Sequence, residues 1–369
     1  MKIVADENMP LVEEYFSEYG EIVTLPGRQL SHNDVVDADI LLVRSVTNVN
    51  HELIHDSKVK FVATATIGTD HLDKHYLEKS NIIWTSAPGC NADSVAEYDV
   101  TMLAYLYKTK GFEVKGKKVG VIGCGNVGSR VIKRLEILGA IVLSYDPPRA
   151  EWDNGFNSVA LEELYDSDVL CLHAPLTESG RHPSFHMIGE SFFKKLNKNA
   201  YIISAGRGPV IDFKSLVSLD LKKFILDVWE PEPDINHDIM NECLLATPHV
   251  AGYSLQSKWR GTEMVFAKAA KIFGWQIDKK VKHPIEAPFH SIKNIDSWQD
   301  CVLSLYDPKK DSERTLHSIN QSDDDGGAFD LLRKTYPLRH EFFFPKITDC
   351  QLSGDDLEIC KNLGFNFIE

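Results

Sequence analysis

Short apolar runs that alternate with helical segments constrain the fold of this chain more than any other feature. The first series, within residues 1–98, reads "KIVA", "EIVTL", "ILLVRS", "FVATAT" and "IIWTSA", with segments such as "HLDKHYLEKS" between the runs. Strands that alternate with helices pair in parallel, and the helices cover the faces of the sheet. The first series therefore predicts an α/β domain.

A second series begins after the long amphipathic segment "ADSVAEYDVTMLAYLYKTKGF". Its runs are "KKVGVIG", "AIVLSYD", "VLCLHAP", "AYIISAG", "KFILDVW" and "LLATPHV". The glycine-rich stretch "VIGCGNVGSR" stands at the first strand-to-helix junction of this series, whereas the first series contains no such stretch. We therefore predict that a dinucleotide-binding domain, residues 99–254, is inserted into a substrate domain.

The inserted domain divides the predicted substrate domain into residues 1–98 and residues 255–285. A helix over about residues 255–275 would return the chain to the first domain. The alternation of strands and helices ends after about residue 285. Residues 286–369 are long enough for an appended domain, but their sequence indicates no chemistry.

The glycine motif has the spacing G-x-G-x-x-G, which is weak evidence by itself but strong between a strand and a helix. Gly123 permits the tight turn, Gly125 lets the backbone approach a pyrophosphate, and Gly128 lets the helix pack on the strand. Asp146 follows at about the distance expected for the carboxylate that binds the ribose hydroxyls. The motif predicts a dinucleotide site.

A carboxylate at position 146 favours NAD over NADP, because it would repel the additional phosphate of NADP. Arg149 lies nearby in "YDPPR" and tempers this inference. We interpret Arg149 as a solvated arginine of the loop.

Further charged residues follow other strands of the second series. Arg207 lies in "ISAGRGPVID", Asp227 and Glu232 lie in "LDVWEPEPD", and His249 lies in "TPHVAGYS". Ligands of doubly wound sheets bind at the carboxyl ends of the strands. A guanidinium suits a carboxylate, and an imidazole can take a hydroxyl proton near neutral pH. These residues together predict a hydride-transfer site, although each alone has an ordinary structural alternative.

Two histidine pairs have the i,i+4 spacing that can indicate a metal site. Pro183 interrupts the pair His182 and His186, and no third ligand is apparent for His71 and His75. We therefore predict solvated or structural roles for these histidines, and no metal.

Composition excludes several classes of function. The 369 residues carry a formal net charge of −14, which disfavours a nucleic-acid partner and requires a locally positive site for any anionic substrate. The seven cysteines are widely spaced without a CxxC, as in a reduced cytosolic protein. Acidic residues in "MKIVADENMP" argue against a secretion signal, and no apolar run is long enough for a membrane span. We expect a cytoplasmic protein.

The blocks "VIGCGNVGSRV", "SAGRGPVID", "LDVWEPEP" and "TPHVAGYS" resemble, in the same order, those of the D-isomer-specific 2-hydroxyacid dehydrogenases. The resemblance implies that Arg207 binds the substrate carboxylate, that His249 is the acid/base and that Glu232 is its partner. Glu230 is an alternative partner, but the resemblance implies Glu232, because the family's glutamate lies five residues past the strand-end aspartate, here Asp227. Asp227 would hydrogen-bond the nicotinamide carboxamide.

Within this family, "LLVRSVTNVN", "ATATIGTDHLD", "SAPGCNADSVAEY", "YDPPR", "HVAGYSLQSKWRGT" and the C-terminal extension resemble members that oxidise 4-phospho-D-erythronate in vitamin B6 biosynthesis. The resemblance implies that Ser45, Thr66 and Tyr253 contact substrate, with Arg44 as a source of positive charge. A strand-end salt bridge is the alternative for Arg44. Oxidation of D-3-phosphoglycerate and a non-catalytic NAD sensor stay open as alternative functions.

The resemblance also implies the architecture. We expect an α/β fold of two doubly wound parallel-sheet domains, a flavodoxin-like substrate domain and an inserted Rossmann NAD domain. A small C-terminal domain would form a homodimer. The residues expected at the NAD site are Gly123, Gly125, Asn126, Val127, Gly128, Asp146, Ala174, Ala205, Gly206, Arg207, Asp227 and Gly252.

Overall fold

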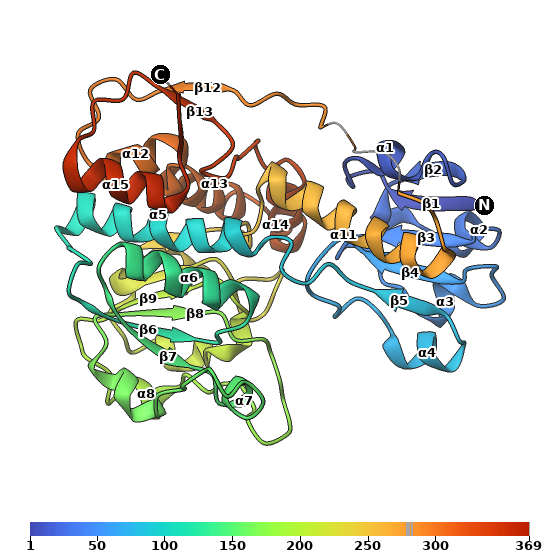
Figure 1. The fold of residues 1–369 in the computed structure, drawn as a ribbon. Coiled ribbons are helices and arrows are strands. Elements are labelled where there is room, and N and C mark those ends of the chain that lie inside the picture. Colours follow the sequence, from blue (N-terminus) through green and yellow to red (C-terminus); the bar gives the residue numbers. More distant parts are fainter. Residues whose placement is uncertain (278–280, 282, 369) are drawn as a thin grey trace. The chain divides into compact units, whose positions relative to one another are not determined.

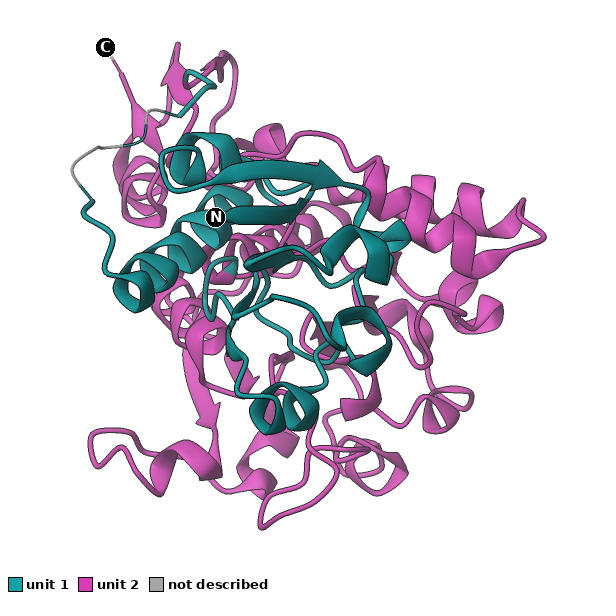
Figure 2. Cartoon of the chain, turned by 90° about the vertical axis from the view of Figure 1, so that its right-hand side faces the viewer, with its two compact units in different colours: residues 1–91, 254–286 teal, residues 92–253, 287–369 magenta. Residues whose placement is uncertain are grey.

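The computed structural model describes residues 1–277, 281 and 283–368, and these residues form two compact units (Figure 2). Unit 1 contains residues 1–91 and 254–286, and unit 2 contains residues 92–253 and 287–369. The parts of the predicted domains 255–285 and 286–369 that fall on residues 278–280, 282 and 369 lie outside the described residues. The predicted division into three domains stays a prediction.

Unit 1 is built on a parallel sheet with the strand order β2-β1-β3-β4-β5. This is the flavodoxin-like order that the sequence analysis expected. Its strands are β1 (Lys2–Asp6), β2 (Glu21–Leu25), β3 (Ile40–Val43), β4 (Phe61–Thr64) and β5 (Ile83–Thr85). Its helices are α1 (Val12–Phe16), η1 (Gly27–Gln29), α2 (His32–Val35), α3 (His51–Ile54), α4 (Lys74–Lys79) and α11 (Leu255–Phe273).

Helix α11 joins the N-terminal part of unit 1 through its apolar face. Phe266 of α11 meets Phe16 of α1 edge to face, with ring centroids 5.1 Å apart, in a core that includes Phe61 of β4. Gly261 lets α11 approach the strand ends, because a Cβ there would lie 2.6 Å from the carbonyl oxygen of Ala65. The helix predicted to return the chain to the first domain is therefore confirmed, and ends at Phe273.

Unit 2 contains a second parallel sheet with the order β11-β10-β9-β8-β6-β7. The order reverses between β6 and β8, and ligands bind doubly wound sheets at such a point. Its strands are β6 (Lys118–Ile122), β7 (Ile141–Tyr145), β8 (Val169–Leu172), β9 (Tyr201–Ser204), β10 (Phe224–Leu226) and β11 (Leu245–Ala246). Its helices up to residue 253 are α5 (Ala92–Lys110), α6 (Asn126–Ile137), α7 (Pro147–Ala150), η2 (Leu161–Asp166), α8 (Glu190–Phe193), η3 (Gly208–Val210), α9 (Phe213–Leu216), η4 (Leu221–Lys223) and α10 (His237–Glu242).

The C-terminal segment 287–369 packs on the rest of unit 2 beside α5 (Figure 1). Trp298, Cys301 and Phe342 join one core with Tyr98 and Leu103 of α5. The elements of the segment are β12 (Phe289–Ser291), α12 (Trp298–Leu305), α13 (Pro308–Asn320), α14 (Asp325–Lys334), β13 (Lys346–Thr348), α15 (Gly354–Leu363) and β14 (Asn366–Phe367).

The expectation that strands and helices stop alternating after about residue 285 is wrong. The alternation of strands and helices does not end after residue 285, because β12, β13 and β14 form a small parallel sheet with helices between them. These strands have three, three and two residues, which is too short for a recognisable pattern. Within the described residues, no helix is both long and apolar enough to span a membrane.

Candidate active site

The glycine motif forms a tight turn at the reversal of strand order in unit 2. Gly123 has a φ of 85°, and a Cβ there would lie 2.5 Å from the amide nitrogen of Ala174, after β8. At Gly128, a Cβ would overlap the carbonyl oxygen of Gly123. Gly123 and Gly128 are therefore required for the turn itself and for the packing of α6 on β6.

Gly125 has a different role, because a Cβ at this position would meet no atom within 4 Å. The residue is the N-cap of α6, a helix of 12 residues whose N-cap side provides no side-chain acceptor for its first N–H groups. A helix N-terminus with a nearby glycine suits a phosphate. The turn therefore fits the pyrophosphate of NAD.

Asp146 lies at the end of β7 and borders the same turn. Its Oδ2 accepts a hydrogen bond of 2.7 Å from the amide of Cys124, and its Oδ1 accepts one of 3.0 Å from the amide of Arg149. The carboxylate is half-buried beside the glycine turn. Its position is compatible with the predicted contact to the ribose hydroxyls.

Arg149 is not the solvated loop arginine that the sequence suggested. Its side chain is 26% exposed, and Nη1 donates to the carbonyl of Cys124 at 2.7 Å and to the hydroxyl of Ser129 at 2.9 Å. Nε donates to Asp153 at 2.9 Å, and the guanidinium lies 4.3 Å from the ring centroid of Phe156. Arg149 therefore stabilises the glycine turn through its hydrogen bonds to Cys124 and Ser129.

Arg207 follows β9 between two glycines. Its Nη1 donates to the carbonyl of Gly206 at 2.9 Å, and the side chain is partly exposed. A Cβ at Gly208 would overlap the carbonyl oxygen of Trp229, which follows β10. The backbone beside Arg207 thus packs directly on the loop that leads to Glu232.

Asp227 is buried at the end of β10 and holds the loop that follows β11. Oδ1 accepts hydrogen bonds from the hydroxyl of Thr247 at 2.6 Å and the amide of Val250 at 2.8 Å. Oδ2 accepts one from the amide of Ala251 at 2.9 Å. Burial raises the pKa of Asp227, while the charge of His249 and these hydrogen bonds oppose the rise. The carboxylate is thus an acceptor that holds the Thr247 side chain before His249 and the backbone amides directly after it.

His249 and Glu232 form the central pair of the site. His249 has a φ of 57°, an uncommon conformation for a residue with a side chain, and its Nδ1 lies 2.9 Å from Oε2 of Glu232. Oε1 of Glu232 accepts a hydrogen bond of 2.9 Å from the amide of Trp229. Desolvation raises the pKa of the Glu232 carboxyl, but the interactions with His249 and with the Trp229 amide lower it by more, so that the net shift of this pKa is downward. Since Nδ1 is occupied, Nε2 is the atom that can exchange a proton with a ligand.

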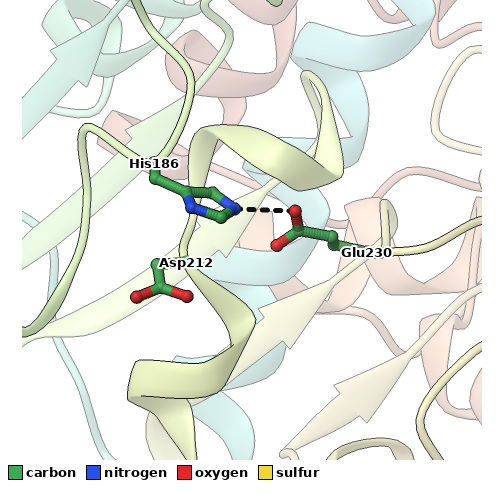
Figure 3. Close-up of side chains that lie close together, drawn as sticks. All are labelled: His186, Asp212 and Glu230. Atoms are coloured by element: carbon green, nitrogen blue, oxygen red, sulfur yellow. Dashed lines mark hydrogen bonds and ion pairs between the residues drawn. The ribbon is translucent and has the colours of Figure 1, made fainter.

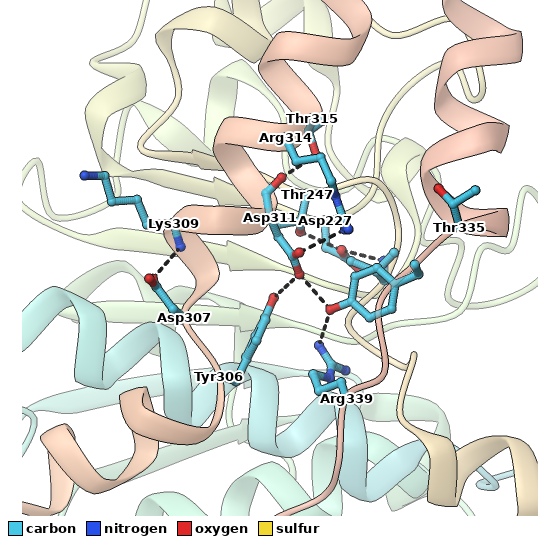
Figure 4. Close-up of polar contacts among 12 residues, drawn as sticks. Asp227, Thr247, Tyr306, Asp307, Lys309, Asp311, Arg314, Thr315, Thr335 and Arg339 are labelled. Carbon is cyan, nitrogen blue, oxygen red and sulfur yellow. Dashed lines mark hydrogen bonds and ion pairs between the residues drawn. The ribbon is translucent and has the colours of Figure 1, made fainter.

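The C-terminal segment contributes a buried polar network behind the His249 loop (Figure 4). Arg339 donates to Ser94 of α5 at 2.8 Å and also to the carbonyl of Ala251. Asp311 of α13 accepts hydrogen bonds from Tyr306 at 2.9 Å and from Tyr336 at 2.6 Å. No sequence pattern predicted these residues. The network anchors the loop from its far side.

Tyr253 lies in the same loop and contacts the C-terminal segment. Its hydroxyl accepts a hydrogen bond of 3.2 Å from Nε of Arg333, at the end of α14. The ring also packs edge to face on Tyr336, with centroids 5.7 Å apart.

The other predicted substrate residues belong to unit 1. There, Arg44 and Ser45 follow β3, and Thr66 follows the neighbouring strand β4.

Thr66 is held at its strand end by short contacts. Its Oγ1 is 2.7 Å from Oγ1 of Thr64 and 3.1 Å from the carbonyl of Gly68, and its own carbonyl accepts from the amide of Ala87. Arg44 is partly exposed and Ser45 is exposed. The carboxyl ends of β3 and β4 therefore present these three residues at one edge of the unit 1 sheet.

The remaining predicted NAD-site residues follow strands of the unit 2 sheet or begin α6. They are Asn126 and Val127 in the first turn of α6, Ala174 after β8, Ala205 and Gly206 after β9, and Gly252 after β11.

One predicted structural histidine has carboxylate neighbours. His186, Asp212 and Glu230 have ligand atoms within 4.8 Å of one another, and Nε2 of His186 is 2.7 Å from Oε1 of Glu230 (Figure 3). Asp212 caps α9 by accepting from the amide of Lys214 at 3.2 Å. Glu230 therefore pairs with His186, whereas Glu232 pairs with His249.

Comparison with known proteins identifies the family. The family described as D-isomer specific 2-hydroxyacid dehydrogenase, NAD binding domain, matches residues 94–251. An erythronate-4-phosphate dehydrogenase of Marinobacter nauticus is 41% identical to this chain over an alignment of 374 residues. The alignment covers 97% of this chain and 97% of that protein. One of Pseudomonas fluorescens is 42% identical and covers 96% of each chain. This chain belongs to the erythronate-4-phosphate dehydrogenase family.

A solved structure shares the fold. The NAD+-bound 3-phosphoglycerate dehydrogenase of Entamoeba histolytica is 27% identical with a TM-score of 0.64, over 76% of this chain and 99% of that chain. The predicted family and the predicted α/β fold with a Rossmann NAD domain are thereby confirmed, whereas dimerisation through the C-terminal domain stays a prediction.

Proposed function

We propose that this protein oxidises 4-phospho-D-erythronate to (R)-3-hydroxy-2-oxo-4-phosphobutanoate with NAD, in the biosynthesis of pyridoxal 5'-phosphate. The observation that carries the proposal is the hydrogen-bonded pair of Glu232 and His249, on the sheet that also bears the glycine turn. Relatives matched over nearly the whole chain are erythronate-4-phosphate dehydrogenases, which supports the substrate. The cofactor is NAD, in agreement with the matched family domain.

The residues of unit 2 divide the chemistry between them. The guanidinium of Arg207 binds the substrate carboxylate through paired hydrogen bonds. Nε2 of His249 accepts the proton of the C2 hydroxyl, and Glu232 stabilises the imidazolium that results. NAD, when bound, supplies the acceptor for the hydride that leaves C2. Asp227 keeps the His249 loop in place throughout the cycle.

The glycine turn would hold the cofactor. Gly125 and the first turn of α6 receive the pyrophosphate, and Asp146 accepts from the adenosine ribose. The family resemblance further supports substrate contacts at Ser45, Thr66 and Tyr253. We further propose a cytoplasmic homodimer formed through residues 286–369.

Oxidation of 3-phospho-D-glycerate is the second candidate, because the solved structure of a 3-phosphoglycerate dehydrogenase shares the fold at 27% identity. A non-catalytic NAD sensor is disfavoured by the intact pair of Glu232 and His249, since a sensor needs no proton acceptor. The fold alone does not separate these functions.

The test compares substrates on the purified protein. NADH formation is followed by absorbance with 4-phospho-D-erythronate, 3-phospho-D-glycerate and D-lactate, each with and without a 2-oxo acid acceptor. We expect the highest kcat/KM with 4-phospho-D-erythronate. Multiple turnovers only with the acceptor would show that the cofactor stays bound. A preference for 3-phospho-D-glycerate would overturn the substrate assignment, and NAD binding without any turnover would support a sensor.

A further inference from the structure

Arg333 places a positive charge from the C-terminal segment beside the proposed active site. It lies in the last turn of α14, and its guanidinium is 5.7 Å from the ring centroid of Tyr253 and 5.8 Å from that of Phe329. Nε donates to the hydroxyl of Tyr253 at 3.2 Å. The two rings and this hydrogen bond hold the guanidinium beside Tyr253.

The same guanidinium acts electrostatically on the catalytic pair. Desolvation raises the pKa of Glu232 and is the largest single effect, but His249 lowers this pKa strongly, and the charge of Arg333 lowers it further by a smaller amount. In return, Tyr253 and Glu232 raise the pKa of Arg333 against the effect of burial. Arg333 therefore stays charged and lies within electrostatic range of the carboxylate that partners His249.

Within the part of the chain that the structure describes, most of the hydrogen-bonding capacity of Arg333 is not used. A guanidinium has five N–H donors, and the hydrogen bond to Tyr253 uses one of them. Glu232 is engaged with His249 and with the amide of Trp229. Among the described residues, no carboxylate lies within ion-pair distance of Arg333. The two Nη groups thus remain for an acceptor from outside the chain.

An anionic ligand is the acceptor that suits this arrangement. The chain has a net charge of −14, so a substrate anion needs a local cation. Arg207 is already assigned to the carboxylate of the substrate. A second planar guanidinium matches the oxygens of a phosphate monoester, to which it can donate two parallel hydrogen bonds.

We propose that Arg333 binds the phosphate of the substrate, so that the C-terminal segment makes the site selective for a phosphorylated hydroxy acid. This inference rests on the proposed function. It agrees with the coverage of the comparisons: the family domain ends at residue 251, whereas the erythronate-4-phosphate dehydrogenases match 96–97% of the chain, which includes most of the C-terminal segment.

The test measures selectivity between 4-phospho-D-erythronate and D-erythronate, which lacks the phosphate. For Arg333→Gln we expect the ratio of the two kcat/KM values to fall about 100-fold, the effect of one or two charge-assisted hydrogen bonds. Arg333→Lys keeps the positive charge but lacks the planar pair of Nη donors, so it should retain part of the selectivity. Lys334→Gln is the matched control, because Lys334 is exposed on the same helix, and it should leave the ratio unchanged.

Two outcomes would overturn the assignment. Equal losses on both substrates in Arg333→Gln would show that Arg333 acts only through Tyr253 or Glu232, and an unchanged ratio would remove it from the site. Absence of turnover by the wild-type protein would instead refute the proposed function. In that case, binding of inorganic phosphate decides the inference: weaker binding in Arg333→Gln but not in Lys334→Gln supports it, and equal binding in all three proteins overturns it.

Discussion

Asp227→Asn tests the role of a buried carboxylate in holding the His249 loop. In one orientation the new amide nitrogen faces the amide of Ala251, and in the other it faces the amide of Val250. Either orientation leaves one buried backbone N–H without an acceptor. The loss of a charge-assisted hydrogen bond and the unpaired donor together cost about 3–5 kcal/mol. Removal of a buried charge recovers part of this, since burial raises the pKa of Asp227. We expect a net destabilisation of about 2 kcal/mol.

The assay is urea unfolding of the protein without NAD, so that cofactor contacts of Asp227 do not contribute. We expect a lower midpoint with an unchanged m-value. Asp238→Asn is the matched control, because Asp238 is exposed in the first turn of α10, and its effect should stay below about 0.5 kcal/mol. A stability of Asp227→Asn equal to that of the control would refute the reasoning.

Three further predictions follow from single positions. Gly125→Ala should keep the stability of the apoprotein but weaken NAD binding by about tenfold or more, whereas Gly128→Ala should lower stability by about 1–3 kcal/mol, as calorimetry and NAD titration would show. Burial, partly offset by Asp70, lowers the pKa of His71 to about 4 from 6.5. The unfolded chain therefore takes up the proton first, and stability should fall by about 3 kcal/mol between pH 6.5 and 4, a dependence that His71→Asn should flatten. Glu232→Gln should reduce kcat about 100-fold with unchanged NAD affinity, and unchanged kcat would exclude a catalytic role.

The two larger sheets could be predicted because their central strands are buried on both faces. "ILLV" in β3 is apolar throughout and "FVAT" in β4 is apolar up to Thr64, and neither strand has an exposed position, as parallel strands in a covered sheet require. The residues that end such strands could also be placed, because all parallel strands of a sheet end at the same edge. Arg207, Glu232 and His249 follow β9, β10 and β11 for this reason.

The contribution of the C-terminal segment could not be predicted. Arg333 lies 80 positions from Tyr253 in the sequence, and "FDLLRK" reads as an ordinary amphipathic helix. Arg149 was misinterpreted for a similar reason. Asp146 caps the short helix α7, and this helix directs the Arg149 side chain back to Cys124 of the glycine motif. The contact between Arg149 and Cys124 depends on tertiary structure that no local sequence pattern encodes. A cluster of cations in "LLRKTYPLRH", within an acidic chain, was the available signal.

The most direct test of the central claim is a single-turnover measurement of NADH formation with 4-phospho-D-erythronate, on the wild-type protein and on His249→Gln. The account predicts that both proteins bind NAD with equal affinity, that the wild type forms NADH, and that the variant forms it at least about 100-fold more slowly. NADH formation at the wild-type rate by His249→Gln would contradict the account.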